Sequence, residues 1–228
     1  MVRYQNLLNI AVDKNREGFI FIDKSNLYNG YRTEMNDMRD LLKNRIFARA
    51  KVYKKLLKVQ KSLTTINPSL FLYITYCYRS IEIQTKLFLK HLSQISKRRF
   101  YKCPLDLYEA VHEKIAVPTV AGHPTGGAVD LLIKDCRTGL FLDFGSNIYD
   151  FESKKSYFFS DDIGQTAKQN RYLLRKIMIK NGFAPYDGEW WHFSYGDFEW
   201  AYYYKKQRAL YDQVNLKTML RMVKESKQ

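Results

Sequence analysis

The chain has 228 residues, of which 46% are hydrophobic and 15% are aromatic. This composition is sufficient for a packed core, and it excludes a largely disordered protein. The formal net charge of +15 favours contact with polyanions such as nucleic acid, anionic cell-wall polymer or a membrane surface, but the basic residues are scattered as on an ordinary solvated surface.

In the first half of the chain, the pattern predicts two helices separated by a buried strand. Long side chains at helical spacing predict a helix over residues 38–62, and the Asn-Pro-Ser sequence at 67–69 ends it. Residues 70–77 are rich in aromatic and β-branched side chains, which predicts a buried strand. Ser80 then begins a second helix that runs to about residue 96.

In the second half, a short helix is expected around 105–114, followed by strands over 128–134 and 140–144 that form a hairpin. After a loop over 145–160, Asp161 or Asp162 caps a helix that ends at Asn181-Gly182. Residues 191–195 form a last strand, and the aromatic stretch 200–204 packs back on the body. No repeat or linker divides the chain, so we predict one domain over residues 1–228. Its fold class is α+β, with a small antiparallel sheet flanked by helices.

Cysteine usage and the N-terminus bear on the compartment. Cys77, Cys103 and Cys136 lack metal-ligand spacing and are expected to be reduced thiols, which favours a reducing compartment. The first fifteen residues do not resemble a signal peptide, and no segment approaches eighteen apolar residues in a row. We therefore expect a cytoplasmic protein without a membrane span, or a periplasmic one if a leader has been removed.

Two short segments, about sixty residues apart, hold the residue types of a zinc site: the stretch GHPTGGAVD at 122–130 and the stretch EWWH at 189–192. His123 lies in a turn that enters a strand. Asp130 lies on an apolar strand, where a carboxylate needs a metal, a buried arginine or a capping role. Zinc takes imidazole and carboxylate ligands, and a catalytic site keeps one position for water. We predict one Zn²⁺ per chain, bound by His123, Asp130 and His192.

The remaining residues of this pattern suggest hydrolysis. Glu189 would accept a proton from water activated by zinc and deliver it to a leaving amine. Taken alone, the segment 189–192 is equally compatible with an exposed edge strand. Arg79 is either the donor to a developing oxyanion or part of a structural salt bridge. His91 and His112 lie in no comparable pattern and are expected to be ordinary surface or cap residues.

These residues resemble the zinc D-alanyl-D-alanine dipeptidases of the VanX type, within the wider group of zinc D,D-peptidases that act on cell-wall peptides. The family patterns are Ser-x-His-x-x-Gly-x-Ala-x-Asp, Glu-x-Trp-His and Gly-Tyr-Arg-Pro. The matching residues are His123, Gly126, Ala128 and Asp130 in the first, Glu189, Trp191 and His192 in the second, and Tyr78 and Arg79 in the third. Further likeness at 25–30, 145–151 and 170–183 extends the resemblance over about residues 20–200.

The resemblance implies a D,D-peptidase/hedgehog-like fold with the zinc site on the sheet. It implies hydrolysis of D-alanyl-D-alanine to two D-alanines in peptidoglycan metabolism, so the expected partner is a small D,D-dipeptide and not a specific nucleic acid. The sequence carries no signal for the oligomeric state. The implied roles are zinc binding by His123, Asp130 and His192, general base and acid catalysis by Glu189, stabilisation of the tetrahedral intermediate by Arg79, and pairing of Asp150 with the dipeptide ammonium through a match that needs a one-residue insertion.

Five positions depart from the family patterns, and these are Ala121, Gly122, Thr125, Ser80 and Phe21. They leave the predicted ligands and base intact but remove polar groups near the ends of the substrate. Two alternatives therefore stay open. A D,D-carboxypeptidase or peptidoglycan endopeptidase of the same fold would have an open groove in place of a closed pocket. A polyanion-binding protein with a structural zinc would need a fourth ligand.

Overall fold

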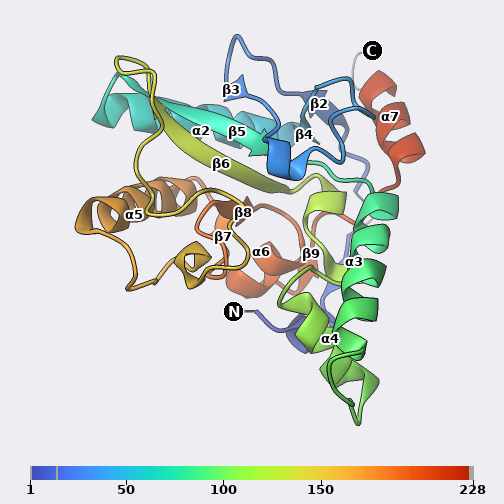
Figure 1. Cartoon of the computed structure of the whole chain (residues 1–228). Coiled ribbons are helices and arrows are strands. Elements are labelled where there is room, and N and C mark those ends of the chain that lie inside the picture. The colour runs from blue at the N-terminus through green and yellow to red at the C-terminus, as the bar shows by residue number, and fades with distance from the viewer. Residues whose placement is uncertain (1, 14, 226–228) are drawn as a thin grey trace.

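The computed structural model describes residues 2–13 and 15–225, and its centre is a five-stranded sheet in the order β3-β5-β6-β8-β7 (Figure 1). Strand β3 runs parallel to β5, and the other neighbours are antiparallel. The predicted α+β class is confirmed, and the sheet is mixed because of this one parallel pair. The strands of this sheet are β3 (Tyr28–Asn29), β5 (Leu70–Tyr76), β6 (Ala128–Asp135), β7 (Ala184–Pro185) and β8 (His192–Ser194).

Two further strand pairs lie outside this sheet: β1 pairs with β9 in parallel, and β2 pairs with β4 in antiparallel orientation. These strands are β1 (Ala11–Val12), β2 (Phe19–Phe21), β4 (Phe47–Arg49) and β9 (Arg208–Ala209). The helices are α1 (Tyr4–Leu7), α2 (Ala50–Ile66), α3 (Ile81–Ser96), α4 (Pro104–His112), α5 (Gln165–Lys180), α6 (Phe198–Tyr203) and α7 (Leu216–Glu225). Short 3₁₀ turns cover 33–35, 118–120, 123–125 and 154–156. Within the described residues, no helix is long and apolar enough to cross a bilayer.

The pairing of β5 with β6 positions the residues at the centre of the sheet. The first six residues of β6 are buried, which explains its nearly continuous apolar sequence. A register irregularity between Ile74 and Tyr76 leaves Tyr76 opposite Asp130, and the Thr75 hydroxyl donates to the Asp130 carbonyl at 3.1 Å. On the other side of β6, Asp130 lies opposite His192 of β8. One buried carboxylate is therefore held between two strands.

Two hydrophobic clusters support this sheet. The larger one joins β5, β6 and β8 to α2, α5 and α7. The smaller one brings α1, α3, α4 and α6 together through Leu7, Phe88, Val111 and Ala201. Helices α3 and α4 pack against one another and stand to one side of the sheet (Figure 1). That side faces the start of β6 and β8, where the predicted ligands lie.

Several predicted elements are confirmed. The buried strand covers 70–76, and helix α3 begins as expected, because the Ser80 hydroxyl accepts a hydrogen bond from the Ile83 N–H at 3.3 Å. Helix α5 ends at Lys180, with Asn181 as its C-cap, and Gly182 then takes a φ of +84°. The three cysteines are free thiols, as predicted. The cytoplasmic location expected from them stays a prediction, as does the single domain.

Other boundaries were wrong for identifiable reasons. The helix predicted over 38–62 begins at Ala50. Residues 46–49 are all buried, which a helix with one buried face does not allow, and residues 47–49 form a strand that pairs with β2. Helix α5 begins after Gly164 and not after an aspartate cap. The strand predicted over 140–144 is reduced to a single bridge between Lys134 and Phe141, since Leu140 and Phe141 are exposed.

His112 was expected to be a surface or cap residue; it is buried, so the surface alternative is wrong. It is the last residue of α4, and its Nδ1 accepts a hydrogen bond from the Val117 N–H at 3.2 Å. Its ring lies 5.9 Å from that of Tyr4 in the smaller cluster. Burial disfavours the charged imidazolium and lowers the pKa of His112 to about 4. His112 therefore stays neutral in the folded protein at pH values where an unfolded chain would protonate it.

We predict that His112 makes folding stability depend on pH between about 6.5 and 4. In this window the unfolded chain binds a proton that the folded chain does not, so the free energy of unfolding falls as the pH falls. The full difference is about 3 kcal/mol. Urea unfolding from pH 7 to pH 4 should show a steeper loss for wild type than for His112→Asn, which retains an acceptor. His91→Asn is the control, and equal slopes for wild type and His112→Asn would contradict the prediction.

Candidate metal centre and active-site cavity

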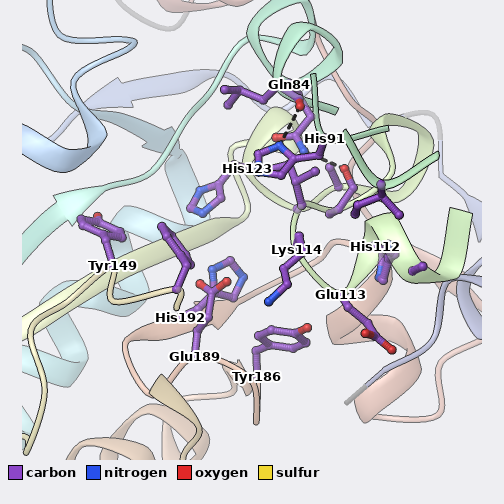
Figure 2. Close-up of a pocket in the computed structure, with 18 of the residues that line it drawn as sticks. Gln84, His91, His112, Glu113, Lys114, His123, Tyr149, Tyr186, Glu189 and His192 are labelled. Atoms are coloured by element: carbon purple, nitrogen blue, oxygen red, sulfur yellow. Dashed lines mark hydrogen bonds between the residues drawn. The ribbon is translucent and has the colours of Figure 1, made fainter. Parts of the chain in front are cut away.

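His123, Asp130 and His192 converge from three places in the fold. His123 begins a 3₁₀ turn before β6, Asp130 lies on β6, and His192 begins β8. Their ligand atoms all lie within 4.8 Å of one another, and all three residues are buried. The His192 Nδ1 is 2.9 Å from Asp130 Oδ1, and the His123 Nε2 is 3.4 Å from Asp130 Oδ2. Figure 2 shows the two imidazoles on the wall of a common cavity.

The turn that carries His123 depends on two glycines. Gly126 has a φ of +72°, and a Cβ there would lie 2.2 Å from the Phe19 ring. A Cβ on Gly127 would lie 2.5 Å from the Tyr195 carbonyl oxygen. The Thr125 hydroxyl donates to the Gly122 carbonyl at 2.6 Å and accepts from the Gly127 N–H at 2.9 Å. The sequence at this turn therefore fixes the backbone from which His123 projects.

The outer nitrogen of each imidazole also has a neighbour. The Nδ1 of His123 donates to the Cys77 carbonyl at 2.6 Å, so its Nε2 is directed towards Asp130. The Nε2 of His192 lies 3.7 Å from Glu199 Oε2 on α6. A carbonyl or carboxylate behind a ligating histidine is the usual arrangement at metal sites, because it fixes the ring and its tautomer. The sequence reasoning missed Glu199, and the signal available was Asp197, whose side chain accepts from the Trp200 N–H at 2.9 Å and begins α6.

The three side chains fit zinc. Zinc–nitrogen distances of about 2.0–2.1 Å place two tetrahedral donors roughly 3.3 Å apart, close to the separations of 3.4 and 2.9 Å between these atoms. Burial alone would raise the pKa of Asp130, but the two imidazoles hold it well below its ordinary value. Burial likewise works against a charge on His192, yet Asp130 raises the pKa of His192 to about 10. The carboxylate thus attracts a positive charge to the point where a cation would bind.

The two imidazoles respond differently to the same carboxylate. At His123 burial prevails and lowers the pKa, whereas the hydrogen bond to Asp130 prevails at His192. The shorter distance to Asp130 and the nearby Glu199 and Glu189 raise the pKa of His192, whereas Arg79 and His192 add to the lowering at His123. Binding of a divalent cation requires neutral imidazoles and would therefore release the proton shared by His192 and Asp130.

Glu189 lies in the same cavity, in the turn that precedes β8. Its carbonyl oxygen accepts a hydrogen bond from the His192 N–H at 3.1 Å, which ties its position to that of the ligand. Burial raises the pKa of Glu189 to about 7, although the nearby His192 opposes the shift. A carboxyl group with such a pKa can both accept and return a proton near neutral pH.

Arg79 follows β5, is buried and also lines this cavity. Its Nε donates to the Tyr76 hydroxyl at 3.1 Å and lies 3.5 Å from Asp37 Oδ2, while its Nη1 donates to Gln84 Oε1 at 2.9 Å. The Tyr76 hydroxyl also bonds to Asp37. The two interpretations of Arg79 are therefore compatible, because its salt bridge holds a guanidinium at the wall of the cavity.

Asp150 lies on the cavity wall next to Tyr149. Its Oδ1 accepts a hydrogen bond from the Ser153 N–H at 3.2 Å, which closes a local turn. Tyr149 has a φ of +67°, and its hydroxyl bonds to Thr75 at 2.7 Å. The structure thus places every site residue predicted from the sequence around one cavity. These residues are His123, Asp130, His192, Glu189, Arg79 and Asp150.

The cavity has a volume of about 1050 Å³ and extends well beyond the metal centre. One face of α3 lines it, through residues at helical spacing. These are Gln84, Leu87, His91, Gln94 and Ile95, and they span about 16 Å of helix. The segment 112–116 after α4 contributes to the cavity lining as well. His91 is thus part of the cavity lining, and its Nδ1 lies 2.9 Å from the Leu87 carbonyl oxygen.

Two departures from the family patterns have structural explanations. A Cβ on Gly122 would lie 2.3 Å from Asp197 Oδ2, so a glycine leaves room for the buried aspartate that begins α6. Ser80, which replaces a proline, caps α3. Ala121 is buried and contributes a methyl group to the cavity wall. No polar contact by the side chain of residue 121 is therefore possible at this wall.

Comparison with known proteins places these features in a family context. The model of the peptidase M15 family, described as D-ala-D-ala dipeptidase, matches residues 32–213. The chain is 27% identical over 181 residues to the D-alanyl-D-alanine dipeptidase of Synechocystis sp., which covers 70% of this chain and 73% of that protein. It is 29% identical over 155 residues to that of Enterococcus faecium, covering 68% and 75%. The match to that of Enterococcus faecalis is 38% identical over 78 residues and spans 34% of this chain and 38% of that protein.

We predict that Glu199 strengthens metal binding through His192. The change Glu199→Gln should weaken zinc binding by about 10- to 100-fold, because it removes the charge that orients this imidazole. Asp130→Asn should weaken binding further, since it replaces a ligand. Competition with a chelating dye measures both affinities. Glu152→Gln is the matched control on the cavity wall, and unchanged zinc affinity in Glu199→Gln would contradict the role given to Glu199.

We also predict that Gly122→Ala destabilises the fold. The new methyl group would force Asp197 to move, and overpacking of this kind costs about 1–3 kcal/mol. Gly164→Ala is the control, because a Cβ there meets no heavy atom within 4 Å and the backbone φ is −66°. Denaturant unfolding measures the free energy of unfolding of both variants. Equal values would show that Asp197 does not require a glycine at position 122.

Proposed function

The chain belongs to the peptidase M15 family of D-Ala-D-Ala dipeptidases, and on this basis we propose that it hydrolyses D-alanyl-D-alanine to two D-alanines with one zinc ion. Membership confirms the resemblance drawn from the motifs and makes the protein a metallopeptidase. The observation that carries the proposal is the convergence of His123, Asp130 and His192 in one cavity with Glu189. This set provides a metal site and a proton acceptor next to it.

The roles of the residues follow from their chemistry. His123, Asp130 and His192 would hold the zinc ion, which when bound supplies Lewis acidity and lowers the pKa of water towards about 7. Glu189, whose pKa is about 7, takes a proton from the attacking water and then passes it to the leaving amine. Arg79 carries a permanent charge and is held by Tyr76 and Gln84, so it can donate to the carbonyl oxygen as negative charge develops there.

The substrate preference rests on Asp150. Its carboxylate lies in the cavity wall, where it is available to pair with the ammonium group of an unblocked dipeptide. Such pairing would favour free D-Ala-D-Ala over the same sequence with an acylated N-terminus. N-acetyl-D-Ala-D-Ala is the direct comparison, since a neutral acetamide replaces its ammonium group.

A second candidate is cleavage of longer D,D-peptides, as in a D,D-carboxypeptidase or peptidoglycan endopeptidase. The observation that favours it is the size of the cavity, about 1050 Å³, which continues along α3. An extended dipeptide is only about 7 Å long, whereas the lining face of α3 is about 16 Å long. Turnover of the free dipeptide against a blocked dipeptide and a pentapeptide ending in D-Ala-D-Ala would separate the two candidates.

We predict that Glu189→Gln lowers kcat for D-Ala-D-Ala by about 10²- to 10⁴-fold, because the amide neither accepts nor returns the proton. Zinc content should stay near one ion per chain, since Glu189 is outside the ligand set. Release of D-alanine measures the rate. Glu113→Gln, on the same cavity wall, is the control and should retain wild-type activity. Full activity of a zinc-loaded Glu189→Gln variant would show that another group is the base.

A further inference from the structure

Lys114 places a cation in the cavity of the metal centre. It follows α4 by two residues and lines the cavity together with Glu189 and Tyr186. Figure 2 shows its side chain directed into the cavity, towards the side where Glu189 and Tyr186 lie. Among the residues that the structure describes, none forms a hydrogen bond or ion pair with its ammonium group. The charge is therefore available to a ligand.

The backbone that carries Lys114 is held in place. Its N–H donates to the Val111 carbonyl at 2.9 Å, and the next residue, Ile115, donates to the same oxygen at 2.9 Å. Buried His112 accepts the Val117 N–H and closes this turn. The end of α4 thus fixes the backbone position from which the exposed Lys114 side chain extends into the cavity.

The other cations of the cavity are engaged or lie elsewhere along it. Arg79 is bonded to Tyr76 and Gln84 and paired with Asp37. Arg98 and Arg99 follow the C-terminal end of α3, where both are exposed, and the Arg99 guanidinium lies 4.7 Å from the centre of the Tyr101 ring.

The acidic groups around the metal centre give such a cation a role in binding a zwitterionic dipeptide. Asp130, Glu189, Glu199 and Asp150 all line the cavity, so a substrate carboxylate would meet several groups of its own sign. Tyr149 and Lys114 lie on opposite sides of the two imidazoles (Figure 2), and Asp150, which follows Tyr149 in the chain, lines the same cavity. A dipeptide whose ammonium group faces Asp150 would therefore direct its carboxylate towards Lys114.

We propose that Lys114 forms a carboxylate-binding subsite for the leaving-group end of the substrate. The inference rests on the proposed function, because it assumes a dipeptide with a free C-terminus. Ala121 lines the cavity, and its methyl side chain offers no hydrogen bond to that carboxylate. The subsite makes the enzyme selective for a substrate with a free C-terminal carboxylate, whereas Asp150 binds the ammonium group at the N-terminus of the substrate.

The test compares D-Ala-D-Ala with its C-terminal amide in wild type, Lys114→Met and Lys114→Arg. A charge-assisted hydrogen bond to a carboxylate corresponds to a change in KM of about 10- to 100-fold. Lys114→Met should raise KM for the acid by this factor, with kcat changed by less than about threefold, and should leave KM for the amide unchanged. Lys114→Arg should recover part of the preference for the acid. Lys90→Met on α3, outside the cavity lining, is the control with unchanged KM.

A binding measurement separates recognition from turnover. In the slow Glu189→Gln background, calorimetry with D-Ala-D-Ala should show the same 10- to 100-fold weakening on Lys114→Met. Equal effects on acid and amide, or no effect on either, would overturn the subsite while leaving the proposed function intact. A zinc-loaded wild type that hydrolyses neither the dipeptide nor its amide would overturn the proposed function and the subsite with it. Melting temperatures of the variants identify any loss that comes from misfolding.

Discussion

The buried carboxylate of Asp130 is the group on which the site depends. It lies on the middle strand of the sheet, opposite Tyr76 on one side and His192 on the other. An isolated charge at such a position is costly, and each of its oxygens therefore faces an imidazole. A buried carboxylate that requires positive charge can also bind a metal, so this position in the sheet connects the strand pairing with the chemistry of the site.

The neighbours of the ligands come from elements that are distant in sequence. The Cys77 carbonyl fixes His123, Glu199 of α6 stands behind His192, and Asp37 holds the pair Tyr76 and Arg79. Each of these contacts restricts a side chain that would otherwise have several rotamers. The sheet supplies the positions of the functional groups, and the surrounding loops and helices supply their orientations. Catalysis requires side chains that are held in a defined orientation, and these contacts provide that orientation.

The sequence predicted the ligands, the base and the class of fold because these follow from local patterns. His123 stands in a glycine-rich turn, and Asp130 interrupts an apolar strand, so each is recognisable within about ten residues. Glu199 and Lys114 stand in no such motif, although Asp197 marks the start of α6, because their importance comes from where α6 begins and where α4 ends in space. The start of α2 was misplaced for the same reason, since residues 47–49 join a strand through pairing with residues 19–21.

The arrangement also argues against a structural role for the metal. A structural zinc site is closed by four protein ligands, whereas the cluster in the described part of the chain has three. Glu199 does not serve as the fourth, because it lies on the far nitrogen of His192 and not on the Nδ1 that faces Asp130. Glu189 lines the same cavity, and its raised pKa suits proton transfer better than coordination. The cavity lining around the centre carries several carboxylates, so the positive net charge of the chain does not make this centre a binding site for a polyanion.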